Sequence, residues 1–254
     1  MNLTAVVMGG EDWREHDRRL LFYTHERGKL TALARGVRKI ESKLAAHLEP
    51  FTTTEVFFVE GYRGLIVAGS VVEEPRLTLR SDLDRLTTAG RIVYITDAMT
   101  PLESRDERIF DILDSTLTLI DKSELRPHGQ NLLIHLYAWK LLSLSGYHPE
   151  LKRCLVCRKV SLSPITYMHP RRGGIVHEHC LTPQSQEGMK TLSIHHEALK
   201  GLAYMLNAPL SDISRLVGSS LAFEEMCEAV ELIVEERFDI AAHSTYWQTA
   251  LIAS

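Results

Sequence analysis

The chain has 254 residues, of which 44% are hydrophobic and 24% charged, and its formal net charge is −4. This composition is typical of a globular protein, and the length suffices for one large domain or two small ones. A membrane-spanning helix is excluded, because no stretch approaches eighteen uninterrupted apolar residues. The net acidity also means that nucleic acid would have to bind at a local basic patch rather than through bulk charge.

The first eighty residues are predicted to form β-strands. Short apolar or alternating runs rich in Val, Ile, Thr, Phe and Tyr are separated by glycine or charged residues. The predicted strands are Leu3–Met8, Arg19–His25, Lys29–Val37, Thr53–Glu60 and Leu65–Glu73. Five closely spaced strands without a long helix between them favour a small closed or nearly closed barrel, and an SH3-like barrel fits the pattern almost as well.

Basic residues gather in and after the third predicted strand, where Glu41 is the single acid. They are Arg27, Lys29, Arg35, Arg38, Lys39 and Lys43. A cluster of cations on one edge of a barrel is what a phosphate backbone would bind, so these six are candidate DNA-binding residues. The alternative, a solvated surface without a ligand, stays open at this stage.

Several aromatic residues near this segment have two possible roles. They could stack on unpaired bases, as candidates Phe22, Tyr23, Phe51 and Tyr62. They could instead belong to the core of the barrel, and we predict a core position for Phe22, Phe51, Phe57 and Phe58.

After Pro75 the apolar residues recur at helical spacing. Ser81 and Asp84 are placed as a capping pair for the first helix, and Gly146 ends the third. The predicted helices are Ser81–Met99, Asp106–Asp121, His128–Leu144, Ser193–Leu206 and Ser220–Phe238. We expect a helical bundle, interrupted by a long connection with few apolar residues.

Two pairs of metal-binding residues lie in that connection. Cys154 and Cys157 are separated by two residues, and so are His177 and Cys180. Four sulfur and nitrogen ligands suit tetrahedral zinc, and a site without an open position indicates a structural ion. His177 is preferred to His179 because its spacing copies that of the cysteine pair.

Other roles for the cysteines are less well supported. A redox C-x2-C pair would need a thioredoxin-like βαβ pattern, which the flanking residues lack. Cys227 lies at helical spacing among apolar residues and is predicted to be a small core residue. Three of the four cysteines belong to the metal pattern, and the N-terminus has no basic segment that leads into an apolar core. Both observations fit a cytoplasmic protein.

No catalytic constellation emerges from the sequence. It contains no G-x-x-x-x-G-K-[ST], no G-x-S-x-G and no H-E-x-x-H pattern. We therefore predict that the protein is not an enzyme.

Two blocks of sequence carry a family likeness. GKLTALARGVRKIESKLAAHLEPF (Gly28–Phe51) contains a glycine turn, a strand ending in alanine-x-glycine, basic residues and a closing proline-phenylalanine. LYAWKLLSLSGYHPELKRCLVC (Leu136–Cys157) leads into the first metal pair, and a glycine pair precedes the second. Both blocks resemble the RecO family of bacterial recombination mediators and DNA-repair proteins, in the same order and over most of the chain. At position 177 the family usually has cysteine, whereas this chain has histidine.

The resemblance implies an α+β fold. A five-stranded OB-fold barrel that binds DNA is expected in residues 1–79, and an α-helical domain in residues 80–254. The helical domain would carry a zinc-knuckle insertion at about residues 150–182, with one structural Zn²⁺.

The resemblance also implies a function. The protein would bind single- and double-stranded DNA without sequence specificity, anneal complementary strands and help to load RecA onto protein-coated single strands. RecR and single-strand-binding protein would be partners, with a functional link to RecF and RecA, and the protein would be cytoplasmic and nucleoid-associated, with no membrane partner. The alternative is a structural adaptor that docks a partner through its helices without binding DNA.

Overall fold

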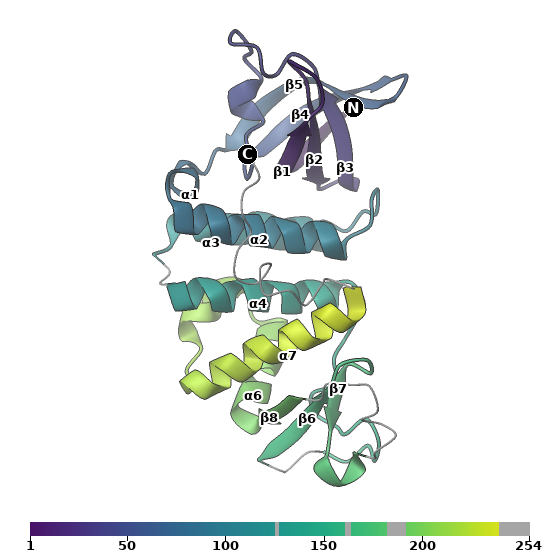
Figure 1. Ribbon diagram of the computed structural model, residues 1–254, viewed down its shortest axis with the longest axis vertical. Helices are drawn as coiled ribbons and strands as arrows, with labels where there is room; N and C mark the ends of the chain where they lie inside the picture. The colour runs from purple at the N-terminus through teal and green to yellow at the C-terminus, as the bar shows by residue number, and fades with distance from the viewer. Residues whose placement is uncertain (125–126, 161–163, 182–191, 239–254) are drawn as a thin grey trace. The chain divides into compact units, whose positions relative to one another are not determined.

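The computed structural model describes residues 1–124, 127–160, 164–181 and 192–238 (Figure 1). These residues form two compact units that divide after Glu124. The predicted domain boundary at residue 79 stays a prediction, and the first compact unit also includes three helices. Parts of two predictions lie outside the described residues: 161–163 and 182 of the insertion, and also 125–126, 183–191 and 239–254 of the helical domain that contains it.

The first unit begins with a closed five-stranded barrel, as the sequence predicts. Its strands are β1 (Asn2–Asp12), β2 (Arg18–Thr24), β3 (Gly28–Ala34), β4 (Thr53–Gly61) and β5 (Gly64–Glu74). They are ordered β1-β2-β3-β5-β4, with β3 and β5 parallel and the other neighbours antiparallel. This order is that of the OB-fold, which is therefore confirmed over the SH3-like alternative.

Alternate side chains of the strands fill the barrel. Phe22 and Phe58 meet edge to face with ring centroids 5.4 Å apart, and Phe51 is also buried. The prediction that Phe57 belongs to the core is wrong. Phe57 directly precedes Phe58 on β4 and so points to the opposite face, where its side chain is 43% exposed.

Three helices complete the first unit: α1 (Leu77–Ser81), α2 (Leu83–Met99) and α3 (Glu107–Lys122). An aspartate caps each long helix. Asp82 accepts a hydrogen bond from the backbone N–H of Arg85 at 2.9 Å, and Asp106 caps α3 in a similar way. The predicted capping pair of Ser81 and Asp84 is wrong, because the carboxylate that reaches the free N–H is that of Asp82.

A buried arginine joins the barrel to α3. Arg76, in a left-handed conformation with φ of 45°, is 2% exposed. Its guanidinium group donates hydrogen bonds to the Phe51 carbonyl (2.7 Å) and the Thr53 hydroxyl (2.8 Å) on the barrel side. It also donates to the Asp114 carboxylate (2.6 Å) on α3. One charged group thus satisfies acceptors from both parts of the unit, which stabilises an otherwise strained backbone position.

A second attachment lies at the start of β3. The Lys29 ammonium group contacts both the carbonyl (2.6 Å) and the carboxylate (2.8 Å) of Asp97 on α2. Gly28 has a φ of 70°, and a Cβ at this position would lie 2.0 Å from the Ser104 carbonyl oxygen. This end of the barrel therefore rests closely on the helices, as Figure 1 shows.

The second unit contains the helices α4 (Pro127–Leu144), α6 (His196–Asn207) and α7 (Ser220–Phe238). It also contains a sheet of order β7-β6-β8, formed by β6 (Ile165–His169), β7 (Gly174–Val176) and β8 (Leu192–His195). The sheet was not predicted, because strands of three to five residues are too short to show a clear alternation. The predicted helix Ser193–Leu206 accordingly begins later, at His196, after β8.

Helix α4 is the centre of the second unit. Nearly all of its side chains between Leu132 and Leu142 are buried, and it packs against α6 and α7. The buried Trp139 indole donates a hydrogen bond to the Leu202 carbonyl of α6 at 3.1 Å. Within the described ranges no helix is long and apolar enough to cross a bilayer.

An ionic contact links α4 to α7. His135, almost fully buried, lies 2.7 Å from the Glu231 carboxylate through Nε2 and 2.7 Å from the Asn131 carbonyl through Nδ1. Burial disfavours the charged imidazole, but the hydrogen bonds with Cys227 and Glu231 outweigh it and raise the pKa of His135 to about 9. His135 is therefore an imidazolium at neutral pH.

Replacing Arg76 by methionine should destabilise the barrel and α3 together. Losing one partner of a buried ion pair typically costs about 3 kcal/mol or more. Hydrogen exchange of the barrel amides, followed by mass spectrometry on the full chain, measures this change. The matched control is Arg80→Met, because the Arg80–Glu49 pair is longer (3.3 Å) and more exposed, and its loss should cost less than about 1 kcal/mol. Equal effects of the two substitutions would contradict the role given to Arg76.

The stability of the second unit should fall as pH rises. Folding raises the pKa of His135 from 6.5 to about 9. The charged imidazolium therefore contributes its full stabilisation of the folded state below pH 6.5, and this contribution is lost as pH rises through 9. Its size should be about 3 kcal/mol, since one pKa unit corresponds to about 1.4 kcal/mol. Thermal unfolding in excess zinc, followed by Trp139 fluorescence in a chain with Trp13→Phe and Trp247→Phe, should show the fall when His135 is present, and a flatter profile in His135→Gln. The exposed His196, changed to glutamine, serves as the control, and parallel profiles of wild type and His135→Gln would contradict the assignment.

Candidate metal centre and nucleic-acid interface

The first pair of predicted metal ligands lies on a tight turn. The Cys154 N–H donates to the Lys159 carbonyl (2.9 Å), and the Arg158 N–H donates back to the Cys154 carbonyl (3.0 Å). The Val156 N–H points at the Cys154 sulfur, 3.4 Å away. These bonds direct the thiols of Cys154 and Cys157 to the same side of the turn.

The second pair follows β7. A short 3₁₀ helix, η2 (Glu178–Cys180), begins after His177, and the Cys180 N–H donates to the His177 carbonyl at 2.9 Å. The two turns are held together by the Leu155 N–H, which donates to the Ile175 carbonyl at 2.9 Å. Gly174 permits this approach, since a Cβ there would lie 2.7 Å from the Glu150 carbonyl oxygen.

The structure brings Cys154, Cys157, His177 and Cys180 into one cluster, with their ligand atoms within 4.8 Å of one another. The Cys157 sulfur is 3.4 Å from His177 Nδ1. His179 is outside the cluster and stacks its ring on that of His177, with centroids 5.1 Å apart. Ligand atoms around zinc lie roughly 3.5–3.8 Å apart, so small side-chain movements would complete a tetrahedron.

The thiols of the cluster differ in acidity. Burial opposes ionisation of Cys154, but hydrogen bonds from the backbone outweigh it and lower its pKa to about 7. Partial burial and hydrogen bonds with the neighbouring thiols raise the pKa of Cys180 to about 11. The thiols cannot all ionise easily side by side, because neighbouring thiolates repel one another. A bound cation favours the thiolate form at every position, so a metal ion would stabilise all of them together. Three sulfurs and an imidazole, with no carboxylate, fit zinc and not calcium or magnesium.

A different kind of site lies on the barrel. The turn between β1 and β2 and the turn between β4 and β5 border a groove of about 850 Å³ over β2, β3 and the start of β5. In an OB-fold, the face of the second and third strands and these two turns commonly bind oligonucleotides. The charged and aromatic residues of the groove are Trp13, Arg14, Asp17, Arg19, Arg35, Tyr62 and Arg63.

The groove combines positive charge with aromatic surface. Asp17 is its only acidic lining residue, and its carboxylate is engaged with the Gly36 N–H at 2.8 Å. The Arg19 guanidinium lies over the Trp13 ring, 3.6 Å from its centroid. Tyr62 is fully exposed. Such a surface can bind phosphates and stack bases without reading their sequence.

The six cations predicted from sequence occupy three different surroundings. Arg35 lines the groove. The segment that follows Arg35 exposes Arg38, Lys39 and Lys43. The Arg38 side chain pairs with Asp12 at 2.9 Å, and the Arg38 backbone N–H donates a hydrogen bond to the His16 carbonyl in the turn between β1 and β2.

Lys29 lies at the opposite end of β3, roughly 20 Å from Arg35 at about 3.3 Å per residue, and Arg27 precedes the strand. Arg27 contacts Glu103 at 3.6 Å, and Lys29 is buried against Asp97. The structure therefore does not bring Lys29 to the groove. Reasoning from sequence missed four residues of the groove. Trp13, Arg14 and Arg63 lie in the first and last turns of a five-stranded barrel, and Arg19 lies at the start of β2; these positions were a signal that could have found them.

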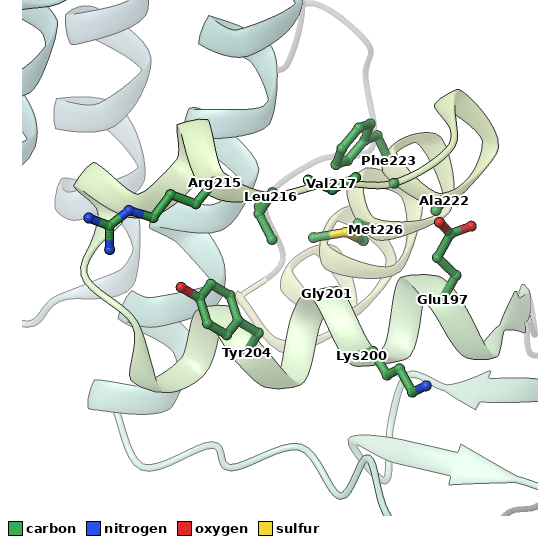
Figure 2. Close-up of a pocket in the computed structure, with 11 residues that line it drawn as sticks. Glu197, Lys200, Gly201, Tyr204, Arg215, Leu216, Val217, Ala222, Phe223 and Met226 are labelled. Atoms are coloured by element: carbon green, nitrogen blue, oxygen red, sulfur yellow. The ribbon is translucent and has the colours of Figure 1, made fainter.

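The second unit has a smaller, apolar groove of about 440 Å³ between α6, α7 and the segment that precedes α7. Figure 2 shows Met226 and Leu216 at its centre, with Tyr204 and Lys200 along α6. Gly201 lets the two helices approach, since a Cβ there would lie 2.6 Å from the Met226 sulfur. None of its lining residues forms a catalytic constellation.

Comparison with known proteins agrees with both halves of this architecture. Residues 1–66 match the family profile "Recombination protein O N terminal", and residues 80–245 match "Recombination protein O C terminal". A DNA repair protein RecO from Dehalococcoides mccartyi is 31% identical over 84% of this chain and 80% of its own length. The RecO proteins of Heliobacterium modesticaldum (31% identity, 85% of this chain and 78% of the relative) and Alkaliphilus metalliredigens (24%, 92% of each) are also similar.

The barrel, the helical unit and these matches define a DNA-repair protein of the recombination-mediator class. The chain belongs to the RecO family. The resemblance drawn from the two sequence blocks is confirmed.

The metal content of the protein should depend on the four residues of the cluster and not on Cys227 or His179. Elemental analysis of purified protein should find one metal ion per chain in the wild type, and far less in Cys157→Ser and in His177→Ala. Cys227→Ser and His179→Ala are the matched controls and should keep one ion, because neither residue is in the cluster. Loss of metal from His179→Ala but not from His177→Ala would reverse the choice between the two histidines.

Proposed function

We propose that the barrel groove binds the sugar-phosphate backbone of DNA without sequence specificity. The observation that carries this proposal is the convergence of four arginines and two aromatic side chains on one groove between two turns of an OB-fold. Of these arginines, Arg14, Arg35 and Arg63 form no ion pair with an acidic side chain of the described residues. Phosphate contacts fix the position of a strand but carry no sequence information.

The groove suggests how both single and double strands would be bound. Tyr62, and the exposed part of Trp13, offer stacking surfaces for unpaired bases, while the guanidinium groups would contact phosphates of either form. Neutralising phosphates on two strands lowers their repulsion, so complementary strands would pair faster without any covalent chemistry. We therefore propose annealing activity and no enzymatic activity.

The wider role follows from the family. We propose that this protein, with RecR and in functional connection with RecF, helps to load RecA onto single strands covered by single-strand-binding protein, in the cytoplasm and at the nucleoid. We also propose that the four-ligand cluster holds one structural Zn²⁺. The ion would keep the two turns of the insertion together and would not contact a reacting group.

The adaptor alternative has one observation in its favour, the apolar groove in Figure 2, whose edge includes the almost fully exposed Val217. A protein that acted only through this groove would not bind DNA. Absence of binding at low salt would therefore favour the adaptor over the mediator.

Removing the groove cations should weaken DNA binding and reduce its dependence on salt. Each phosphate contact on a single strand contributes about −0.7 to the slope of log K against log salt, so Arg14→Ala, Arg35→Ala and Arg63→Ala together should flatten it by roughly two. Fluorescence anisotropy with a labelled oligothymidine, titrated with salt, measures both quantities. The matched control replaces three exposed cations outside the groove, Arg105, Lys122 and Lys200, and should change little.

A second pair of variants in the same assay separates stacking from charge. Tyr62→Ala should weaken binding by about 1–3 kcal/mol without changing the salt slope, because stacking releases no counterions. Phe57, an exposed aromatic residue on β4 that does not line the groove, is its control. Wild-type affinity and slope in both the triple variant and Tyr62→Ala would place the DNA surface elsewhere.

A further inference from the structure

Exposed cations surround the metal cluster of the second unit. Residues 150–181 contain six arginines and lysines, and only two acidic residues, Glu150 and Glu178. This excess contrasts with the net charge of −4 of the whole chain. The six exposed side chains form what we call the knuckle surface: Lys152, Arg153, Arg158, Lys159, Arg171 and Arg172.

The fold of the insertion brings these cations together from two separate turns. The Glu150 N–H donates to the Gly173 carbonyl (2.9 Å), and the Ile175 N–H donates to the Glu150 carbonyl (3.0 Å). The Arg172 guanidinium reaches across to the Leu155 carbonyl at 3.1 Å. The first turn, with four of the cations, therefore lies against the turn that carries the other two.

Little of this charge is neutralised within the described residues. Lys152, Arg153, Arg158 and Lys159 form no ion pair with any acidic side chain placed by the structure. Arg171 is the exception, with a contact to Glu236 at 2.5 Å.

The carboxylate nearest to the first turn is occupied by the backbone. Glu150 accepts hydrogen bonds from the N–H groups of Lys152 and Arg153, at 2.9 and 3.0 Å, rather than pairing with a side chain. Cations held close together without counter-charges repel one another, so a surface of this kind favours an anionic ligand.

We propose that the knuckle surface is a second phosphate-binding surface, which contacts the backbone of nucleic acid independently of the barrel groove. This proposal rests on the proposed function, which makes DNA the ligand of the chain. Long, unpaired cations spread over two turns match a polyanion with regularly spaced charges. Because the turns are joined at the metal cluster, the proposal gives the ion a role: it holds the cations in one surface.

Two phosphate-binding surfaces in one chain would let the protein contact two stretches of backbone at once. The metal cluster would then contribute to nucleic-acid binding indirectly, by positioning cations, and without contacting the ligand.

The test uses the full chain with its metal content measured, and a labelled 60-nucleotide oligothymidine titrated with salt. The knuckle variant carries Lys152→Gln, Arg153→Gln, Arg158→Gln and Lys159→Gln, all at exposed positions outside the cluster. Four lost phosphate contacts should flatten the salt slope by two to three, at about 0.7 each. The same substitutions in the groove triple variant should remove its residual binding. Chelation of the metal should flatten the slope of the wild type but not that of the knuckle variant.

The matched control removes four exposed cations outside both surfaces, Arg105, Lys122, Lys200 and Arg215, and should leave the slope nearly unchanged. A knuckle variant that binds like the wild type while the groove variant fails would overturn this inference and leave the proposed function intact. Failure of the knuckle variant alone would instead overturn the groove as the DNA site. An equal loss in the control would reduce the effect to bulk charge and overturn the inference. Loss of polyglutamate binding without loss of DNA binding would assign the knuckle surface to an acidic protein segment.

Discussion

The buried guanidinium group of Arg76 determines how the first unit is organised. It satisfies a strand hydroxyl, a loop carbonyl and a helix carboxylate together, and the ion pair with Asp114 holds the end of β5 against α3. The Arg76 contacts and the Lys29–Asp97 ion pair together hold one end of the barrel against α2 and α3. The turns at the other end of β3 remain available, and the basic groove lies there. The position of the candidate DNA site is thus a consequence of where the barrel is anchored.

The second unit contains a long connection that has too few apolar residues to form a hydrophobic core of its own. Its described part buries only a few side chains of that kind, such as Met168, Ile175 and Val176. A three-stranded sheet and a cluster of four residues that could hold a metal ion stand in place of the missing core, because a ladder of hydrogen bonds does not require apolar surface and bonds to an ion would not either. Because few positions of these turns have to be apolar, many of them can carry cations. A candidate metal site and a basic surface can therefore share one insertion.

The two units therefore place positive charge in two ways. In the barrel, cations extend from turns and strand ends of a scaffold stabilised by a hydrophobic core that includes Leu20, Phe22 and Phe58. In the insertion, they extend from turns joined by hydrogen bonds between Glu150, Gly173 and Ile175. Both arrangements give an acidic chain local basic surfaces, which is what sequence-independent binding of a phosphate backbone requires.

The sequence by itself determined the five strands, the long helices and the four clustered candidate metal ligands, since each depends on periodicity or spacing along the chain. The family followed from the resemblance of two sequence blocks to known proteins. The sequence could not determine which cations are free. Lys29 and Arg35 lie six residues apart in one basic segment, yet Lys29 is buried against Asp97, 68 residues away in sequence, while Arg35 lines a groove with Arg63. Alternation along β4 separates Phe57 from Phe58, but the sequence could not say which of the two faces the core before the register of β4 was known. Only the tertiary structure decided these points, because the partner that neutralises or buries a side chain is supplied by a distant part of the chain.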